Sequence, residues 1–302
     1  MGRAANRGAP CRTVRHAAAG ARPATEAASD KPCAIDGETD GARLINLERY
    51  PIDDSNSPTC RRLVDDCRAQ LRETGVAVLS DLVRPEAAAR MAEEMAARIG
   101  DAYFCQGRHN AYLKCPDLDL PDEHPRNLEM DTEVGSIAWD RIGPGTALRQ
   151  LYLWDPLVRF VGAVLEREPF YRFADPLGAC SVNVFRPGMG HGWHFDEAEY
   201  TTSLMLQKAD AGGEFEYAPF LRPRRGEDYE AVGRVLAGDE SKVRRLKFEP
   251  GTLSIFHGRR ALHRVTRCEG KRDRLVAILC FASEPNAVNS DTVRKLFWGR
   301  TQ

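Results

Sequence analysis

The chain has 302 residues, 42% of them hydrophobic and 29% charged, with a formal net charge of -1. This length and composition support one large domain or two small ones around a sizeable core. The balanced charge argues against a protein built mainly to bind nucleic acid, which would carry a basic excess. The nine cysteines are scattered with no CxxC pair, so we expect reduced thiols. No apolar run approaches membrane-spanning length, so we expect a cytoplasmic protein without a membrane partner.

The first part of the chain, residues 1–42, differs from the rest. It is rich in Ala, Arg and Gly and shows little apolar periodicity, so we expect a disordered extension. Up to Thr25 it is basic and poor in acidic residues, as a transit peptide would be. An over-long reading of the gene start would give the same pattern. We expect residues 43–302 to form a single domain.

Helices are expected to precede most of the strands. The elements expected in the first half are, in chain order, a helix at 59–75, a strand at 76–83, a helix at 84–100, a loop-like region to about 135 and a long helix at 146–166. Gly75 and Gly100 would close the first two helices.

Short strand candidates dominate the second half. They lie at 180–186, 192–196, 201–207, 213–218, 252–257, 261–266 and 274–282, interrupted by one helix at 227–238. Many short strands in succession indicate a sandwich, barrel or jelly roll, and helices ahead of them indicate an α+β domain. We expect an α+β fold with a double-stranded β-helix core, a cupin-like jelly roll, on which the N-terminal helices pack.

The segment GWHFDEAEYTTSLMLQ (192–207) places His194 and Asp196 two residues apart in a strand candidate. Residues i and i+2 of a strand point to the same face, so the imidazole and the carboxylate can converge. His263 lies on a strand about seventy residues later, which a jelly roll can bring alongside. The three form a plausible 2-His-1-carboxylate site, which leaves coordination positions open for non-haem Fe(II) chemistry. The alternatives are a hydrogen-bonded His–Asp pair or a non-catalytic cupin-like metal site.

Arg274 lies eleven residues after His263 and opens the apolar strand RLVAILCF. A guanidinium at a strand start can hold a carboxylate with two parallel hydrogen bonds. Arg272 is the rival in the sequence KRDR, and a solvated basic turn is the alternative to both.

The motif H-x-D, a distant His and an Arg some ten residues later resembles the Fe(II)/2-oxoglutarate-dependent oxygenase superfamily. LRETGVAVLSDLV also resembles the helix–strand lead-in of that family, and the resemblance covers roughly 60 to 300. It implies Fe(II) held by His194, Asp196 and His263, 2-oxoglutarate paired with Arg274, and O2 as co-substrate. Residues 43–302 would then be one oxygenase domain. Thr202 and Thr266 could also contact the cosubstrate, but ordinary strand threonines fit the pattern equally well.

A narrower resemblance is carried by HPRN, AWDRI, ADPLG, GWHFDEAEYTTSLMLQ, GGEFEYAP and LHRVT. These segments are similar to the subgroup that contains free amino-acid halogenases and related hydroxylases of lysine-like substrates. In those halogenases a Gly replaces the metal carboxylate and chloride binds in the vacancy. This chain keeps Asp196, so the resemblance implies hydroxylation, or desaturation, of a C–H bond.

The same subgroup implies four substrate contacts. His191 and Glu197 match positions that contact the amino-acid substrate, and Trp298 matches a C-terminal aromatic that covers it. Arg126 in HPRN is a looser match to an arginine that could hold the substrate carboxylate. By strand spacing alone His191 would face away from His194 unless Gly192 kinks the chain. Glu197 likewise alternates away from Asp196 unless the strand ends there.

The remaining histidines and basic stretches have plainer interpretations. His257 precedes Gly258 at a strand end and is expected to be structural, and His109 and His124 lie in loop-like sequence without a partner at metal spacing. The stretches RPRR (222–225) and KVRRLK (242–247) are expected to be solvated faces. Nucleic acid is therefore not an expected partner.

The expected function is hydroxylation of a small molecule, a free and basic amino acid, in specialised metabolism, with succinate and CO2 as co-products. Desaturation of the same substrate class is one alternative, and an oxygenase for a carrier-bound or protein-bound residue is another. A Zn(II) hydrolase or isomerase on a cupin-like barrel would ignore 2-oxoglutarate, and an emptied barrel would only bind. The sequence carries no indication of the oligomeric state.

Overall fold

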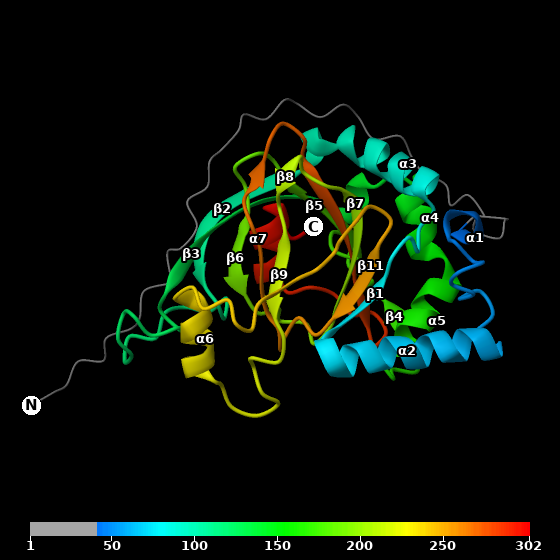
Figure 1. Cartoon of the computed structure of the whole chain (residues 1–302). Helices are drawn as coiled ribbons and strands as arrows, with labels where there is room; N and C mark the ends of the chain where they lie inside the picture. The colour runs from blue at the N-terminus through cyan, green and yellow to red at the C-terminus, as the bar shows by residue number, and fades with distance from the viewer. Residues whose placement is uncertain (1–40) are drawn as a thin grey trace, which may run out of the picture.

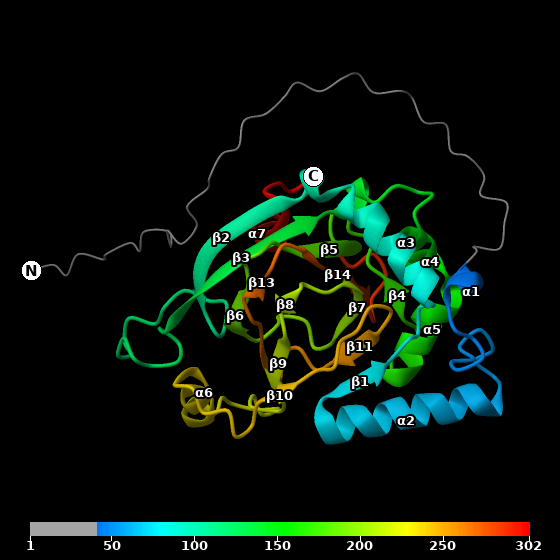
Figure 2. The same cartoon turned by 45° about the horizontal axis from the view of Figure 1, so that its top comes forward.

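A curled antiparallel sheet forms the centre of the computed structural model, which describes residues 41–302 (Figures 1 and 2). The strand order is β1-β11-β7-β14-β5-β3-β6-β12-β9-β10, with β2 paired to β3. The bounds are β1 (Val76–Leu79), β2 (Tyr103–Asn110), β3 (Glu129–Ile137), β5 (Cys180–Phe185), β6 (His191–His194), β7 (Thr201–Gln207), β9 (Phe215–Ala218), β10 (Arg244–Arg245), β11 (Leu253–Phe256), β12 (Leu262–Val265) and β14 (Arg274–Leu279). Two small sheets pair β8 (Ala211–Gly212) with β13 (Cys268–Glu269) and β4 (Tyr171–Arg172) with β15 (Phe281–Ala282).

The curled sheet has two walls that face each other. We call β1, β11, β7, β14, β5 and β3 the major wall, and β6, β12, β9 and β10 the minor wall. They are joined where Thr132 of β3 pairs with His191 of β6. This arrangement confirms the expected α+β jelly roll.

Helices cover the outer face of the major wall. They are α1 (Gly41–Leu44), α2 (Pro58–Thr74), α3 (Pro85–Ala96), α4 (Ala147–Leu153) and α5 (Asp155–Val164), as Figure 1 shows. Leu204, Leu253 and Leu275 of the wall face them in the largest apolar cluster. The alternate residues Met205 and Val276 instead face the space between the walls, which we call the barrel interior. The two-residue period of the strands thus separates helix packing from the interior.

The outer face of the minor wall is covered by α6 (Tyr229–Leu236) and by the loop that follows β2. Trp193 and Phe195 face this cover, so the intervening His194 faces the barrel interior. The last helix, α7 (Asp291–Trp298), contacts β2 and β3. None of the described helices is long and apolar enough to cross a membrane.

Local sequence explains the helix bounds. Ser57 caps α2, because its hydroxyl accepts the Cys60 N–H, and Gly75 ends it in the left-handed region at a φ of 81°. The helix expected at 146–166 is two helices, α4 and α5. Pro156 explains the break, because proline lacks an N–H and its ring clashes with the carbonyl four residues earlier.

Three expectations from the sequence need correction. The loop-like region to about 135 contains β2 and β3, which pair along eight residues from Tyr103 to Asn110. Polar residues at exposed positions of both strands hid their pattern, since β2 is mostly half-buried or exposed. The strand expected at 274–282 ends as β14 at Leu279, and α7 was not expected at all. The extension expected at 1–42 lies outside the described residues, except that Gly41 and Ala42 begin α1.

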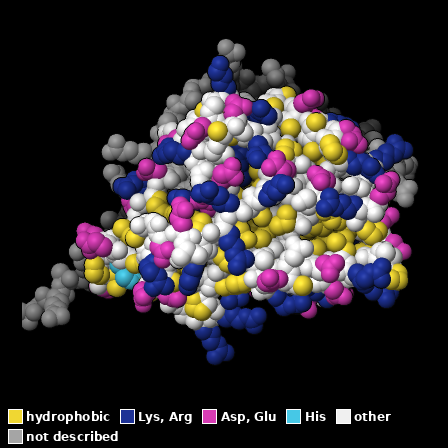
Figure 3. Space-filling view, in the orientation of Figure 1, with side chains coloured by type: hydrophobic (Ala, Val, Ile, Leu, Met, Phe, Trp, Pro, Cys, Tyr) yellow, Lys and Arg dark blue, Asp and Glu magenta, His cyan; other side chains and the backbone are white. Residues whose placement is uncertain are grey.

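Charged side chains of both signs are intermixed on the face of the molecule that Figure 3 shows. In the stretch 222–225, Arg224 and Arg225 are exposed, whereas Arg222 is largely covered and forms an ion pair with Glu227 at 2.8 Å. In the stretch 242–247, Arg245 pairs with Glu216 at 2.8 Å. Most of the basic side chains in these stretches are thus exposed, and Arg222 is the exception.

Candidate metal centre

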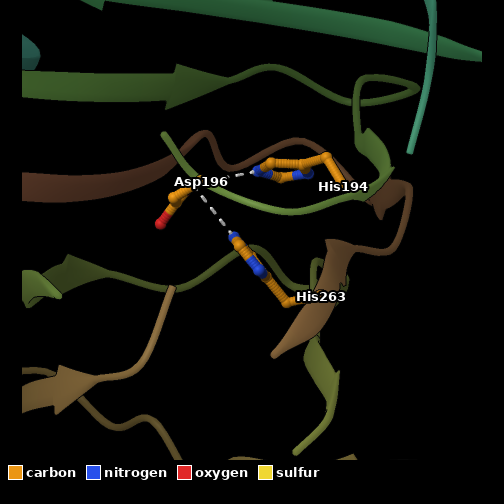
Figure 4. A group of neighbouring side chains, drawn as sticks. All are labelled: His194, Asp196 and His263. Atoms are coloured by element: carbon orange, nitrogen blue, oxygen red, sulfur yellow. Dashed lines mark ion pairs between the residues drawn. The ribbon is translucent and has the colours of Figure 1, made fainter. Parts of the chain in front are cut away.

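His194, Asp196 and His263 converge at one point of the barrel interior (Figure 4). His194 ends β6 and His263 lies directly opposite it on β12, so their side chains share a face. Asp196 Oδ1 lies 3.6 Å from His194 Nε2 and 3.4 Å from His263 Nε2. Adjacent ligands about 2.1 Å from one octahedral ion would lie about 3 Å apart. The three donor atoms therefore fit a single metal ion after small adjustments.

Backbone carbonyls orient both imidazoles. His194 Nδ1 lies 2.8 Å from the Gly192 carbonyl oxygen, and His263 Nδ1 lies 2.9 Å from that of Ala261. A carbonyl oxygen only accepts, so each Nδ1 carries the proton and donates it. Each Nε2 then presents a lone pair towards Asp196. This orientation of the second nitrogen is typical of histidine metal ligands.

The protonation states suit a cation. Burial lowers the pKa of His194 well below its usual value, and the neighbouring His263 adds to the effect. Burial alone would raise the pKa of Asp196, but His263, His194 and the hydrogen bond from Thr201 together lower it. Near neutral pH a half-buried carboxylate thus faces a neutral imidazole of His194. A carboxylate and two imidazole nitrogens that point to one place form a donor set whose chemistry fits a divalent metal.

His191 lies against His194, although strand spacing alone predicts the opposite face. The rings stack with centroids 3.8 Å apart and an angle of 15° between planes. The cause is a β-bulge: His263 and Val265 of β12 pair with His194 and His191 of β6, so two steps on one strand match three on the other. The extra residue returns His191 to the interior face. Gly192 suits this bulge, because a Cβ there would lie 2.7 Å from that of Met130.

His109 also lies beside this group, which its sequence context did not indicate. Its ring centroid is 5.4 Å from that of His191 and 5.9 Å from that of His194. It comes from β2, the strand that the sequence pattern did not indicate, and it contacts the Thr132 hydroxyl. His257, by contrast, packs against Tyr200 with ring centroids 4.5 Å apart, as a structural histidine does.

Arg274 is buried in the barrel interior without an anion. Only 2% of the residue is exposed, its Nε has no hydrogen-bond partner, and within residues 41–302 no carboxylate forms an ion pair with it. Burial lowers the pKa of its guanidinium to about 10, so the group stays charged near neutral pH. A buried unpaired cation is costly, and a carboxylate ligand would remove that cost.

Arg272, the alternative to Arg274 as a carboxylate-binding residue, is exposed and already paired with Asp210. Its guanidinium lies 3.0 Å from Asp210 Oδ1, and its backbone N–H donates to the same side chain. Between the two arginines, only Arg274 is thus available inside the barrel to an anionic ligand.

The two threonines expected near the cosubstrate have different positions. Thr266 Oγ1 accepts the N–H of Glu214, next to Gly213, whose backbone lies against Arg274. Thr202 pairs with Ile255 of the helix-facing apolar cluster and therefore points away from the interior. Its neighbour Thr201 is the residue that reaches the site, where its hydroxyl donates to Asp196 Oδ2 at 2.5 Å. Sequence alternation alone did not decide between these neighbours.

The proposed substrate contacts are only partly brought together. Glu197 is exposed just beyond Asp196, and its backbone carbonyl accepts from Arg259 at 3.0 Å. Arg126 lies over the Tyr112 ring at 5.7 Å, in the cover on the outer face of the minor wall. The structure therefore does not bring Arg126 to the interior face that carries the triad.

Trp298 is 8% exposed and packs with Ala138 and Leu177, where it docks α7. Leu177 precedes β5, whose first residue Cys180 pairs with Leu279, and Leu279 pairs in turn with Thr202. The start of β5 is thus level with the start of β7, where Thr201 meets Asp196. Trp298 docks near the metal end of the interior, and its buried indole N–H has no hydrogen-bond partner among the described residues.

A pocket of about 350 Å³ opens between β3 and β12, beside the start of β6. His191, Gly192 and Thr266 line it together with charged side chains of both signs. The pocket is large enough for a small ligand. Among the site residues expected from the sequence, only His191 and Thr266 line it.

A family model described as halogenase D matches residues 60–296. Among solved structures, the chain is similar to the non-heme alpha ketoglutarate dependent epimerase SnoN from nogalamycin biosynthesis, with a TM-score of 0.50, 11% identity and coverage of 74% of this chain and 83% of that one. It is also similar to AviO1 from Streptomyces viridochromogenes Tue57, with a TM-score of 0.50, 17% identity and coverage of 75% and 97%. A 2OG-Fe(II) oxygenase family protein from Burkholderia pseudomallei has a TM-score of 0.43, 17% identity and coverage of 73% and 91%. No curated protein matches the sequence.

Proposed function

We propose that this chain, which belongs to the halogenase D family, hydroxylates an unactivated C–H bond of a small molecule and does not halogenate it. The observation that carries the proposal is the Asp196 carboxylate. Its Oδ1 lies 3.6 Å and 3.4 Å from the two imidazole Nε2 atoms. The coordination position that a halide would need is therefore filled by the chain itself.

The protein is an enzyme with the Fe(II)/2-oxoglutarate oxygenase fold, and its cofactors are Fe(II) and 2-oxoglutarate. We propose that His194 Nε2, Asp196 Oδ1 and His263 Nε2 hold the iron. When bound, Fe(II) with 2-oxoglutarate and O2 supplies the oxidising power to break a C–H bond, with succinate and CO2 as co-products.

The chain's own contribution is binding, orientation and the exclusion of water. Arg274 would pair with the far carboxylate of 2-oxoglutarate, because its guanidinium is buried without an anion. Phe215 and Phe256 pack against the His263 ring at centroid distances of 5.5 Å and 5.0 Å. These apolar neighbours keep the inner side of the metal position dry, which protects a reactive site from solvent.

We propose a free amino acid, with a basic side chain, as the substrate. Glu197 supports this, because it directly follows Asp196 in the sequence, is exposed, and forms no ion pair with a described residue. A cationic group of the substrate would pair with it. His191 would contact the substrate or support His194, and Trp298 would cover it from α7. Arg126 is not retained as the carboxylate contact, because it lies in the outer cover of the minor wall.

Two other outcomes use the same centre. Desaturation would remove two hydrogens from the same substrate class, and a carrier-bound or protein-bound residue would need an open approach to Asp196. The exposure of residues 197–199 leaves that approach open on one side. A Zn(II) hydrolase is disfavoured, because it would give the buried Arg274 no partner.

The test is oxygen-dependent succinate formation with Fe(II) and 2-oxoglutarate over a panel of free amino acids that includes arginine, lysine and ornithine, in buffer with chloride. Products are identified by mass, and His263→Ala is the control. A product that gains one oxygen, coupled to succinate and lost in the control, is expected.

The other results separate the alternatives. Loss of two hydrogens would establish desaturation, and a gain of chlorine would overturn the role proposed for Asp196. Uncoupled succinate without a modified amino acid would reject the substrate class while keeping the oxygenase. Absence of succinate from an iron-loaded protein, with every amino acid, would count against the whole proposal.

A further inference from the structure

The two oxygens of Asp196 have different surroundings. Oδ1 faces the Nε2 atoms of both triad histidines, at 3.6 Å and 3.4 Å. Oδ2 points away from them and accepts a hydrogen bond of 2.5 Å from Thr201 Oγ1. A short hydrogen bond to an ionised acceptor is among the stronger kinds, so it holds one oxygen and leaves the other for the metal position.

Gly258 closes the other side of the carboxylate. A Cβ at this position would lie 2.9 Å from both Cβ and Cγ of Asp196, and closer still to Oδ2. The Asp196 N–H donates to the Gly258 carbonyl at 3.1 Å. The backbone of Gly258 is thus hydrogen-bonded to the backbone of Asp196 and packs directly against the Asp196 side chain. Any side chain at residue 258 would collide with the Asp196 side chain, so glycine is needed here because it has no Cβ.

The two contacts come from different elements. Thr201 begins β7 of the major wall, whereas Gly258 lies in the turn between β11 and β12. Asp196 itself follows β6 of the minor wall, where no strand pairing constrains it. A carboxylate on such a segment could rotate about its side-chain torsions without the two contacts. The metal-facing direction of Oδ1 therefore depends on the rest of the barrel.

We infer that Thr201 and Gly258 are positioning residues that clamp Asp196 with Oδ1 in the metal position. The inference deepens the proposed function and rests on Asp196 as a metal ligand. The clamp keeps the carboxylate from turning away and conceding its coordination position to an anion from solution. In a family described as halogenases, the clamp would therefore ensure that the Asp196 carboxylate, and not a halide, occupies this coordination position.

Metal affinity tests the clamp independently of catalysis. Anaerobic titration with Co(II), followed by visible absorption, gives both a dissociation constant and a spectrum that reports the ligand set. Thr201→Val keeps the shape of the side chain and removes the donor. We expect it to weaken Co(II) binding about 10–100-fold, the usual effect of losing an outer-shell partner. Thr201→Ser restores the hydroxyl and should restore affinity and spectrum.

Thr202→Val is the matched control, because Thr202 is the next residue and faces the helices. It should leave Co(II) affinity and spectrum unchanged. Gly258→Ala should weaken Co(II) binding in the same direction as Thr201→Val. The double variant Thr201→Val/Gly258→Ala should lose less than the product of the two single losses, since both act on one carboxylate. Urea unfolding of each apo variant separates this effect from general destabilisation.

Several results would overturn the clamp. Wild-type affinity and spectrum in Thr201→Val would do so, as would failure of Thr201→Ser to restore them. Asp196→Ala distinguishes this failure from that of the proposed function. If Asp196→Ala loses metal binding while Thr201→Val does not, Asp196 remains a proposed ligand but the positioning role of Thr201 is rejected. If Asp196→Ala binds Co(II) like the wild type, the ligand set itself is wrong.

Discussion

The two ends of the barrel interior carry opposite unmet charge. At the metal end, an ionised Asp196 faces two imidazole lone pairs and calls for a cation. At the other end, Arg274 is buried and calls for an anion. Asp196 is half-buried, whereas the burial of the Arg274 guanidinium without an anion is costly. As proposed above, a metal ion at one end and a carboxylate ligand paired with Arg274 at the other would satisfy both groups.

The two ends are also built differently. Arg274 begins β14, whose pairing with β5 runs over six residues without a register shift, so its direction follows from alternation along that pairing. The metal end depends on a bulge in β6, on Asp196 beyond the end of that strand, and on Thr201 and Gly258 from other elements. The geometry of a site built from strand ends and turns depends on more residues, and fewer of these residues can be recognised from the sequence pattern.

Loss of a proposed ligand should give the largest effect and affect only the metal end. His263→Ala should abolish turnover and weaken Co(II) binding by more than about a hundredfold, since even an outer-shell partner is worth about 10–100-fold. Isothermal titration calorimetry and the succinate assay would measure both. His124→Ala is the control, because His124 packs on Tyr229 in the outer cover. Equal losses of turnover and Co(II) affinity in His263→Ala and His124→Ala would contradict a specific role for His263 at the metal position.

The ion pair that anchors α7 should give the next largest effect, on stability. Arg294 Nε lies 3.0 Å from Asp175 Oδ2, and the Asp175 side chain is fully buried. Arg294→Ala leaves that buried charge without its cationic partner and should lower the free energy of unfolding by about 3–5 kcal/mol. Urea denaturation would measure it. Arg300→Ala, which breaks an exposed pair with Asp140, should cost less than about 1 kcal/mol.

Acid should weaken the same anchor. Burial alone would raise the pKa of Asp175, but hydrogen bonds from Leu177, Gly178, Asn289 and Arg294 lower it below its usual 3.8. A group whose pKa is lowered by folding stabilises the protein above its unfolded pKa. This stabilisation is complete above about pH 5 and is lost as the pH falls below 3.8 towards the folded pKa. Asp175→Asn should flatten the loss below pH 4; an unchanged acid profile would remove Asp175 as its source.

A smaller effect is expected at the other end of the interior. Arg274→Ala should raise the dissociation constant for 2-oxoglutarate about 10–150-fold, because a hydrogen bond to a charged group is worth about 1.5–3 kcal/mol. Calorimetry with the Co(II)-loaded protein would measure this, and Co(II) affinity itself should change little. Arg272→Ala is the control. If Arg272→Ala weakens 2-oxoglutarate binding and Arg274→Ala does not, the two arginines exchange roles.

The smallest effect is expected at Thr202. Thr202→Val should leave 2-oxoglutarate affinity within about twofold of the wild type, since the residue faces the helices. A tenfold loss in the same calorimetric titration would return Thr202 to the cosubstrate contacts expected from the sequence.

Much of the core could be predicted because strand alternation is local. The period of two predicted that His194 and Asp196 converge, which they do although Asp196 lies just beyond the end of β6. The apolar strand after Arg274 separated it from Arg272. The same rule failed where strands deviate. It predicted that His191 faces away from His194, because a hydrophobic pattern does not reveal a bulge. It also did not identify β2 and β3, because their exposed faces are polar. Arg126 was assigned by resemblance, which carries no information on which face of a wall a loop covers.

The amino-acid sequence by itself indicated the fold class, the His–Asp–His group and the arginine that begins β14, because strand-like spacing, residue chemistry and a motif resemblance can all be recognised without the tertiary structure. Only the tertiary structure decided that Thr201 and Gly258 meet Asp196, that His109 and His191 crowd His194, and that Trp298 docks near the metal end. These contacts join residues from separate elements. Their geometry depends on how the two walls close on each other, which no local pattern records.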